Sequence, residues 1–215
     1  MAGSPNFGER RGGVAPSLVV IHFTAMESCA AARARLCDPA WEVSAHWLVD
    51  EAGHAEALVP EEMRAWHAGA GEWGGAGDVN SRSIGIELQN RGAEPFAAAQ
   101  MAGLERLLAG IMDRWRIAPE GVIGHSDMAP LRKADPGPRF DWRRLALAGL
   151  SVWPAAGVLA PPAAFAAAAR GFGYPDLDED VLLGAFRLRF RPWALGPLDA
   201  VDAGMAVDLA RRFPA

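Results

Sequence analysis

The sequence has 215 residues, 51% of them hydrophobic, and a formal net charge of −5 at pH 7. A chain of this length can bury one full core and a small additional unit. The acidic balance gives no overall basic surface, so we expect neither nucleic acid nor an anionic membrane as a partner. The sequence also lacks an apolar run of 18 residues, and we therefore expect no membrane segment.

The first predicted strand ends in a histidine. Residues 1–16 are polar and contain Gly and Pro, which predicts an irregular lead-in. The apolar run 17–21 predicts a buried strand, and His22 closes it, where α/β folds place their functional sites. An Ala- and Arg-rich helix is expected at about 28–37. This order of elements indicates an α/β protein.

A hairpin and a long loop come next. Residues 43–49 and 54–59 are separated by a turn with Gly and predict a β-hairpin. Residues 61–80 include Trp66 and His67, have no hydrophobic period and predict a long loop. Loops of that length in a compact domain are usually functional.

Regular alternation predicts a second buried strand at 83–89. Its apolar residues share one face, and these are Ile84, Ile86 and Leu88. Glu87 lies on the opposite face, as either a solvated strand residue or a carboxylate at a site. Apolar residues at three- and four-residue steps predict an amphipathic helix at about 96–116, and residues 121–124 then lead into the next segment.

The segment 124–142 predicts a rigid irregular loop. Its prolines fix the backbone and remove hydrogen-bond donors, and these are Pro130, Pro136 and Pro138. His125 and Asp135 are ligand types that such a loop can bring together, and His22 is the natural third ligand, although a lone histidine is more often structural. Two histidines and one carboxylate leave an open position on zinc, which is typical of a catalytic site.

Other polar residues are candidates for substrate binding. Lys133 and Arg132 lie within the predicted ligand loop, close to Asp135, and are either solvated charges or partners of an anionic substrate or transition state. His46 is expected in the core, behind a ligand or in the site wall, and His67 is expected to face a cleft. We predict substrate-binding roles for His46, Trp66, His67 and Arg132.

The chain after residue 150 changes composition. Residues 151–163 are rich in Ala, Gly and Pro, which predicts a domain boundary. Three helices are expected after it, at about 161–170, 178–190 and 198–212. This segment has no His or Cys, so we expect binding or dimerisation rather than catalysis. We also expect a chain truncated near residue 160 to cleave small soluble substrates.

The ordered motifs resemble a known family. They are VIHFT (20–24), VSAHWLV (43–49), AWHAG (65–69), NSRSIGIEL (80–88), GHSD (124–127) and APLRKADPGP (129–138). Together they resemble the zinc-dependent N-acetylmuramoyl-L-alanine amidases, a superfamily that includes phage lysozyme-type amidases and peptidoglycan recognition proteins. Each motif alone is weak, whereas the ordered set, which extends from 17 to 154, is specific.

The resemblance implies a role for each of five residues. It implies zinc on His22, His125 and Asp135, acid/base catalysis by Glu87, and transition-state stabilisation by Lys133. The chain departs from some family members at one position, because they carry a Tyr where this sequence has Ala45. Any role of that hydroxyl is absent here or is taken by another group.

The resemblance also implies an architecture. It predicts an α/β fold with a mixed central β-sheet flanked by helices, plus a small C-terminal three-helix domain. The boundaries are a zinc amidase domain at 1–154 and a helical domain at 155–215. The second domain resembles, less specifically, a peptidoglycan-binding module.

The predicted function is zinc-dependent hydrolysis of the amide between N-acetylmuramic acid, or its 1,6-anhydro form, and L-Ala of a stem peptide. Muropeptides are then the partners, in cell-wall recycling or turnover. One alternative is a non-catalytic module that recognises muropeptides, which the presence of Glu87, Lys133 and Asp135 argues against. Another is a zinc peptidase that cuts within the stem peptide.

The predicted compartment is the cytoplasm. The N-terminal residues show no signal-peptide core or lipobox, although the resembling subtype is often an exported lipoprotein. An intact helix would hold Cys29 and Cys37 roughly 12 Å apart, so we expect free thiols rather than a disulfide. The alternative is a periplasmic or outer-membrane location, if an N-terminal signal was removed.

Overall fold

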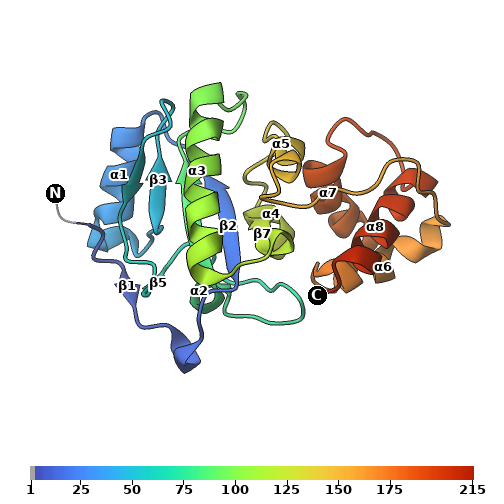
Figure 1. Cartoon of the computed structure of the whole chain (residues 1–215), viewed down its shortest axis with the longest axis horizontal. Helices are drawn as coiled ribbons and strands as arrows, with labels where there is room; N and C mark the ends of the chain where they lie inside the picture. The colour runs from blue at the N-terminus through green and yellow to red at the C-terminus, as the bar shows by residue number, and fades with distance from the viewer. Residues whose placement is uncertain (1–2) are drawn as a thin grey trace.

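The computed structural model describes residues 3–215 and contains a central five-stranded sheet (Figure 1). The strands are β2 (Leu18–Phe23), β3 (Trp47–Val49), β4 (Ala55–Ala57), β6 (Ser83–Leu88) and β7 (Val122–Gly124). Their order is β4-β3-β6-β2-β7. β4 is antiparallel to β3, whereas the other neighbouring pairs are parallel. The predicted mixed sheet in an α/β fold is confirmed.

The two faces of the sheet are covered differently. Helix α3 (Ala98–Trp115) buries Leu104 and Leu108 in the same core cluster as Ile84 and Ile86, which confirms the predicted amphipathic helix. Helix α1 (Cys29–Cys37) packs near β3 at one side of the sheet, away from the C-terminal helices (Figure 1). Because successive strand residues point to opposite faces, the face that α3 leaves free carries Glu87.

The predicted loop 61–80 contains short regular elements. Strand β5 (Arg64–Ala65) pairs with β1 (Phe7–Gly8) in a separate two-stranded sheet. Helix α2 (Val79–Arg82) then leads directly into β6. These elements are too short to produce a hydrophobic period, so the sequence pattern did not reveal them. Short 3₁₀ turns also lie before and after this segment, at η1 (Arg11–Gly13), η2 (Pro39–Trp41) and η3 (Pro119–Gly121).

The segment 124–142 begins with one helical turn. Helix α4 (His125–Met128) follows β7 directly, so the prediction of irregular backbone throughout was wrong for these residues. The helical turn is possible because the first proline comes only at Pro130. The side chain of Asp127 also stabilises the turn by accepting the backbone N–H of Gly124 at 2.8 Å.

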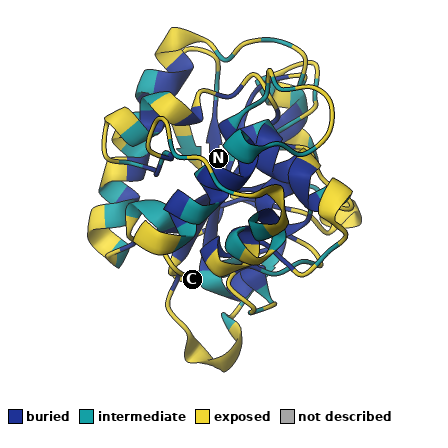
Figure 2. Ribbon diagram, turned by 90° about the vertical axis from the view of Figure 1, so that its right-hand side faces the viewer, coloured by how far each residue is buried: buried dark blue, intermediate teal, exposed yellow. Residues whose placement is uncertain are grey.

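The C-terminal helices share a core with the sheet. They are α5 (Trp142–Leu147), η4 (Pro162–Ala164), α6 (Phe165–Phe172), α7 (Glu179–Phe190) and α8 (Ala200–Arg212). Phe165, Phe172 and Phe186 belong to the same cluster as Val20 and Ile123 of the sheet. Buried residues therefore continue from the sheet into the C-terminal helices. Figure 2, viewed from the side of these helices, shows the buried segments mainly towards the centre of the molecule and the exposed ones mainly at its edges. The division at residue 154 stays a prediction, but the core does not stop there.

Two further expectations concern the cysteines and membrane-spanning segments. Cys29 and Cys37 are free, as predicted. Among the helices of residues 3–215, none combines the length and the apolar character needed to cross a bilayer.

Candidate metal centre and active site

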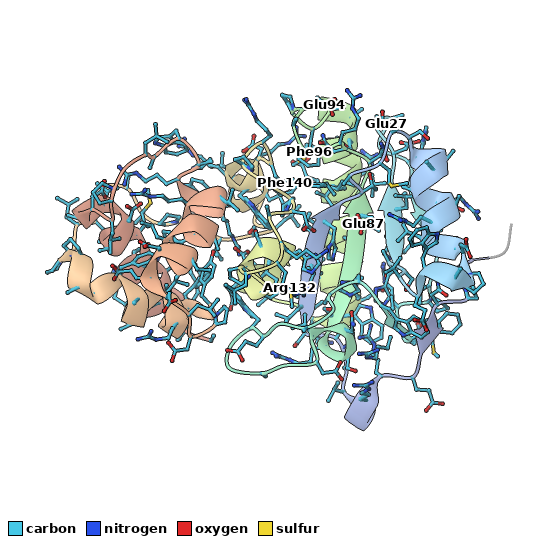
Figure 3. The ribbon with its side chains drawn as sticks, turned by 180° about the vertical axis from the view of Figure 1, so that it is seen from behind. Glu27, Glu87, Glu94, Phe96, Arg132 and Phe140 are labelled. Carbon is cyan, nitrogen blue, oxygen red and sulfur yellow. The ribbon has the colours of Figure 1, made fainter. Side chains whose placement is uncertain are left out.

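The sheet brings three predicted site residues together. β2 and β6 pair in register, which places His22 beside Glu87. Across the other edge of β2, Ile21 pairs with Gly124, so His125 comes next to His22. His22 and Glu87 point away from α3, because the residues that alternate with them pack under that helix. Figure 3 shows Glu87 on this face, between α1 and the segment that carries Arg132.

Three ligand-type atoms form a small triangle. Nδ1 of His22 lies 2.9 Å from Nδ1 of His125 and 2.9 Å from Oδ2 of Asp135. The third side, from Nδ1 of His125 to Oδ2 of Asp135, is 3.1 Å. Tetrahedral zinc with bonds of about 2.0–2.1 Å requires ligand atoms about 3.3 Å apart. The spacing of these three atoms therefore fits three protein ligands on a zinc ion, which leaves its fourth position open.

The protonation of both histidines suits metal binding. Nε2 of His125 lies 2.9 Å from the carbonyl oxygen of Ala68 and donates its proton there, because a carbonyl only accepts. This leaves the Nδ1 lone pair of His125 facing the triangle. Burial, with a further contribution from His125, lowers the pKa of His22 to about 4, so its ring is neutral at pH 7. Neutral imidazoles are the form that binds metals.

Glu87 is a half-buried residue whose carboxyl has a raised pKa. Its Oε2 atom is buried without a hydrogen-bond partner within the described part of the chain. Burial, together with the negative charge of Asp135, raises the pKa of Glu87 to about 8, while Lys133 acts in the opposite direction. A cation at the adjacent triangle would lower the pKa of Glu87 from this value towards pH 7. Glu87 then has a proton affinity that suits a general base at neutral pH.

The raised pKa predicts a change in stability when Glu87 is replaced in metal-free protein. The folded-state pKa lies above the unfolded value of 4.5, so at low pH the carboxyl is neutral in both states and its ionisation does not affect stability. The cost of burying this carboxyl then grows up to about pH 8, because the unfolded carboxyl ionises first. We expect Glu87→Gln to raise the Tm of chelator-treated protein more at pH 8 than at pH 5. Thermal unfolding by circular dichroism measures this.

The control for this experiment is Glu51→Gln, which changes an exposed carboxyl in a turn. Its effect on Tm should be small and similar at both pH values. An equal effect of Glu87→Gln at pH 5 and pH 8 would contradict the raised pKa.

A cavity of about 240 Å³ opens in front of the triangle. It lies between α1 and the loop after α4, and its wall combines the ligand-type residues with apolar and cationic side chains. The lining includes His22, Glu87, His125, Lys133, Asp135, Trp66, His67, Phe23, Met26, Leu36 and Arg35. The cavity is large enough for a small polar substrate group beside an apolar one.

The predicted substrate-binding residues divide into two pairs. Trp66 and His67 line the cavity, as does Lys133. His46 does not, because it is fully buried, accepts the N–H of Gly85 at 2.9 Å and donates to Met63 at 3.0 Å.

Arg132 is also absent from the cavity wall. Its guanidinium donates to the carbonyl oxygens of Ala68, at 3.0 Å, and Ala70. His46 and Arg132 therefore hold backbone segments around the site, and their contact with substrate stays a prediction.

Three residues that support the candidate site were not predicted from the sequence. Ala68 acts through its backbone carbonyl, which leaves no signal in residue type. Ser83 was not considered, although it shares its strand face with Glu87. Asp127 is part of the GHSD motif two residues after His125, so its position was a usable signal.

Comparison with known families decides the classification. The family described as N-acetylmuramoyl-L-alanine amidase matches residues 12–138, which is more than half of the chain. The chain belongs to this amidase family.

Curated relatives agree with this classification. The chain is 36% identical to N-acetylmuramoyl-L-alanine amidase AmiD of Escherichia coli K12, over 91% of the chain and 83% of that protein. It is 40% identical to 1,6-anhydro-N-acetylmuramyl-L-alanine amidase AmpD of Enterobacter cloacae, over 47% of the chain and 54% of that protein. The similarity to AmiD therefore includes the C-terminal helices.

Solved structures give the same result for the fold. AmiD from E. coli in complex with anhydro-N-acetylmuramic acid-L-Ala-D-γ-Glu-L-Lys superposes with a TM-score of 0.83 at 33% identity, covering 97% of this chain and 98% of that one. AmpDh3 from Pseudomonas aeruginosa in complex with anhydromuramic pentapeptide superposes with a TM-score of 0.85 at 31% identity, covering 95% of each chain. The amidase fold and its C-terminal helices match as one unit.

Proposed function

We propose that this amidase is zinc-dependent and hydrolyses the amide between 1,6-anhydro-N-acetylmuramic acid, or N-acetylmuramic acid, and L-Ala of a stem peptide. His22, His125 and Asp135 would hold the zinc ion, which supplies a Lewis acid and lowers the pKa of a bound water to about 7. The observation that carries this proposal is the triangle of ligand atoms with Glu87 in register beside it.

Glu87 and Lys133 have separate roles in the proposed reaction. Glu87 accepts the proton of the attacking water, since it lines the cavity, its Oε2 atom has no partner among the described residues, and the pKa of its carboxyl is raised. It then passes that proton to the leaving amine of L-Ala. Lys133 lines the cavity and places a positive charge where the carbonyl oxygen becomes an oxyanion.

The proposed substrate follows from the relatives and the cavity. The solved complexes of the AmiD and AmpDh3 relatives contain anhydromuramoyl peptides. Trp66 provides an aromatic wall for the sugar or the lactyl group beside the reacting bond. We propose that such fragments arise during recycling in the cytoplasm, where the free thiols of Cys29 and Cys37 stay reduced. Fractionation of the native gene product into the periplasm or outer membrane would contradict this compartment.

Zinc content and product mass test the proposal together. We expect one zinc per chain in purified protein and its loss in His22→Ala, since two ligands rarely hold the ion. Incubation with anhydromuramoyl tripeptide should release the free tripeptide and anhydro-N-acetylmuramic acid, as measured by mass spectrometry. Zinc analysis and the same cleavage assay of the variant complete the test.

The other outcomes separate the alternatives. Intact substrate with a measurable Kd would indicate a recognition module. Cleavage that leaves lactyl-Ala attached to the sugar would indicate a peptidase. Full activity of folded, zinc-free protein would contradict the metal assignment.

A further inference from the structure

His67 lies between a proposed zinc ligand and a strand serine. Its Nδ1 atom is 3.0 Å from Nε2 of His22, and its Nε2 atom is 3.2 Å from Oγ of Ser83. Oγ of Ser83 donates to the carbonyl oxygen of Val79 at 2.6 Å. The contacts form one continuous chain from a backbone carbonyl to the metal triangle.

The protons along this chain can be counted. A carbonyl oxygen only accepts, so the single hydroxyl proton of Ser83 goes to Val79. The Ser83 oxygen must then accept the proton on Nε2 of His67. A neutral imidazole carries one proton, so Nδ1 of His67 is an acceptor, and it takes the Nε2 proton of His22. The Nδ1 lone pair of His22 consequently points at His125 and Asp135.

We propose that His67 is a positioning residue that, with Ser83, fixes His22 in the Nε2–H tautomer and so prepares its Nδ1 atom to bind the metal. The inference rests on the zinc-dependent function proposed above. It gives His67 a role behind the ligand, in place of the predicted contact with substrate.

The strand beneath the ring is shaped for this arrangement. A Cβ atom at Gly85 would lie 2.4 Å from Cγ of His67, so a larger residue there would displace the ring. Ser83, Gly85 and Glu87 alternate on the same face of β6. Ser83 contacts the His67 ring, Gly85 leaves space for the ring, and Glu87 supplies the acid/base group.

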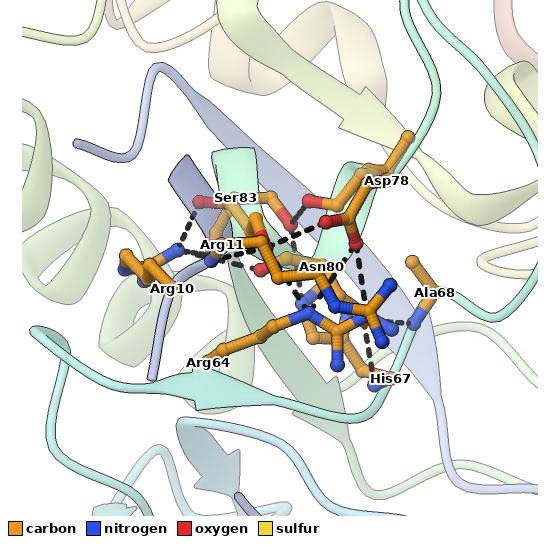
Figure 4. Close-up of polar contacts among 10 residues, drawn as sticks. Arg10, Arg11, Arg64, His67, Ala68, Asp78, Asn80 and Ser83 are labelled. Atoms are coloured by element: carbon orange, nitrogen blue, oxygen red, sulfur yellow. Dashed lines mark hydrogen bonds and ion pairs between the residues drawn. The ribbon is translucent and has the colours of Figure 1, made fainter. Parts of the chain in front are cut away.

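The backbone of His67 is also fixed. Oδ1 of Asn80 accepts the N–H of His67 at 3.0 Å and that of Ala68 at 2.8 Å (Figure 4). Ala68 in turn accepts the proton of His125. One loop therefore sets the protonation of both histidine ligands, through the ring of His67 and the carbonyl of Ala68.

Removing the hydrogen-bond partner that orients a ligating histidine lowers the metal affinity of a site by roughly 10–100-fold. We expect that loss in His67→Leu, measured as the zinc Kd by chelator competition. His67→Asn keeps an acceptor near the position of Nδ1 and should recover most of the affinity. The control is His54→Leu, because His54 is exposed and lies away from the triangle.

A spectroscopic experiment tests the tautomers directly. The sequence has 5 histidines, so long-range ¹H–¹⁵N spectra of histidine-labelled protein are simple to assign. We expect His22 and His67 to carry their protons on Nε2 in the metal-free wild type. In Ser83→Ala the acceptor is lost, and an Nδ1-protonated form of His67 should appear. A merely structural role would not change the tautomer.

The outcomes are distinct from those of the proposed function. An Nδ1-protonated His67 in the metal-free wild type overturns the inference, even if the protein binds zinc and cleaves its substrate. Wild-type zinc affinity in folded His67→Leu does the same. Absence of zinc binding in the wild type would instead contradict the proposed function, while the tautomers would still decide the role of His67.

Discussion

Glu87→Gln should lower kcat by about 10²–10⁴-fold, because the change removes a general acid/base and keeps the shape of the side chain. Zinc content and KM should change little, since Glu87 lies beside the ligand triangle and is not part of it. Steady-state cleavage of anhydromuramoyl tripeptide, with zinc analysis of the same samples, measures both effects.

The matched control for this experiment is Glu51→Gln, which makes the same change at an exposed turn residue outside the cavity wall. A near wild-type kcat for zinc-loaded Glu87→Gln would mean that another group accepts the proton. Loss of zinc from the variant would assign Glu87 to metal binding instead.

Arg189→Met should destabilise the folded protein by about 3–5 kcal/mol, because it leaves a buried carboxylate without its cation. Arg189 is 2% exposed and donates to Oδ2 of Asp127 at 2.7 Å. Asp127 is fully buried and also accepts the hydroxyl of Tyr174 at 2.7 Å. Arg189 and Tyr174 belong to the C-terminal segment, whereas Asp127 lies two residues after His125.

Chemical denaturation of the variant measures this loss, and Arg189→Met combined with Asp127→Asn should recover part of it. The control is Arg187→Met, which removes one of the two cations that pair with Asp202 inside the C-terminal segment and leaves Arg191 in place at 3.0 Å. Its folded fraction should keep a kcat closer to wild type than that of Arg189→Met. Unchanged unfolding of Arg189→Met would show that the interface contributes little.

The contacts of Asp127 with Arg189 and Tyr174 argue against the expectation that a chain truncated near residue 160 still folds and cleaves small substrates. A chain that ends near residue 160 lacks Tyr174 and Arg189 and exposes the apolar residues of the sheet that pack against Phe165 and Phe172. The earlier expectation of a separable catalytic part rested on the absence of His and Cys from the C-terminal segment. Residue type identifies catalytic groups, but a buried ion pair across an interface is visible only in three dimensions.

The positions of the candidate site residues were predictable where side chains lie near the carboxyl ends of strands. His22 and Glu87 occupy clear strand patterns, and the order of the parallel strands then places them side by side. His125 and Asp135 were predicted from ligand type and loop rigidity, and the structure brings their ligand atoms together.

The supporting contacts could not be predicted in the same way. The proton path through His67 depends on which nitrogen faces which neighbour, and no spacing rule gives that orientation. His46 and Arg132 show the same limit, since both have polar side chains suited to substrate but are occupied by backbone groups. The number of free hydrogen-bonding atoms at a site follows from packing, not from composition.

The continuous core between the sheet and the C-terminal helices has a mechanical consequence. A flexible tether lets a catalytic unit sample a sphere whose radius grows with the square root of tether length. Here Asp127, Tyr174 and Arg189 join the two parts rigidly, so no such search is available. If the C-terminal helices bind a wall polymer, the distance between that binding site and the active site is fixed. The enzyme then cleaves at a constant distance from the bound position and must dissociate from the polymer before it can reach another bond.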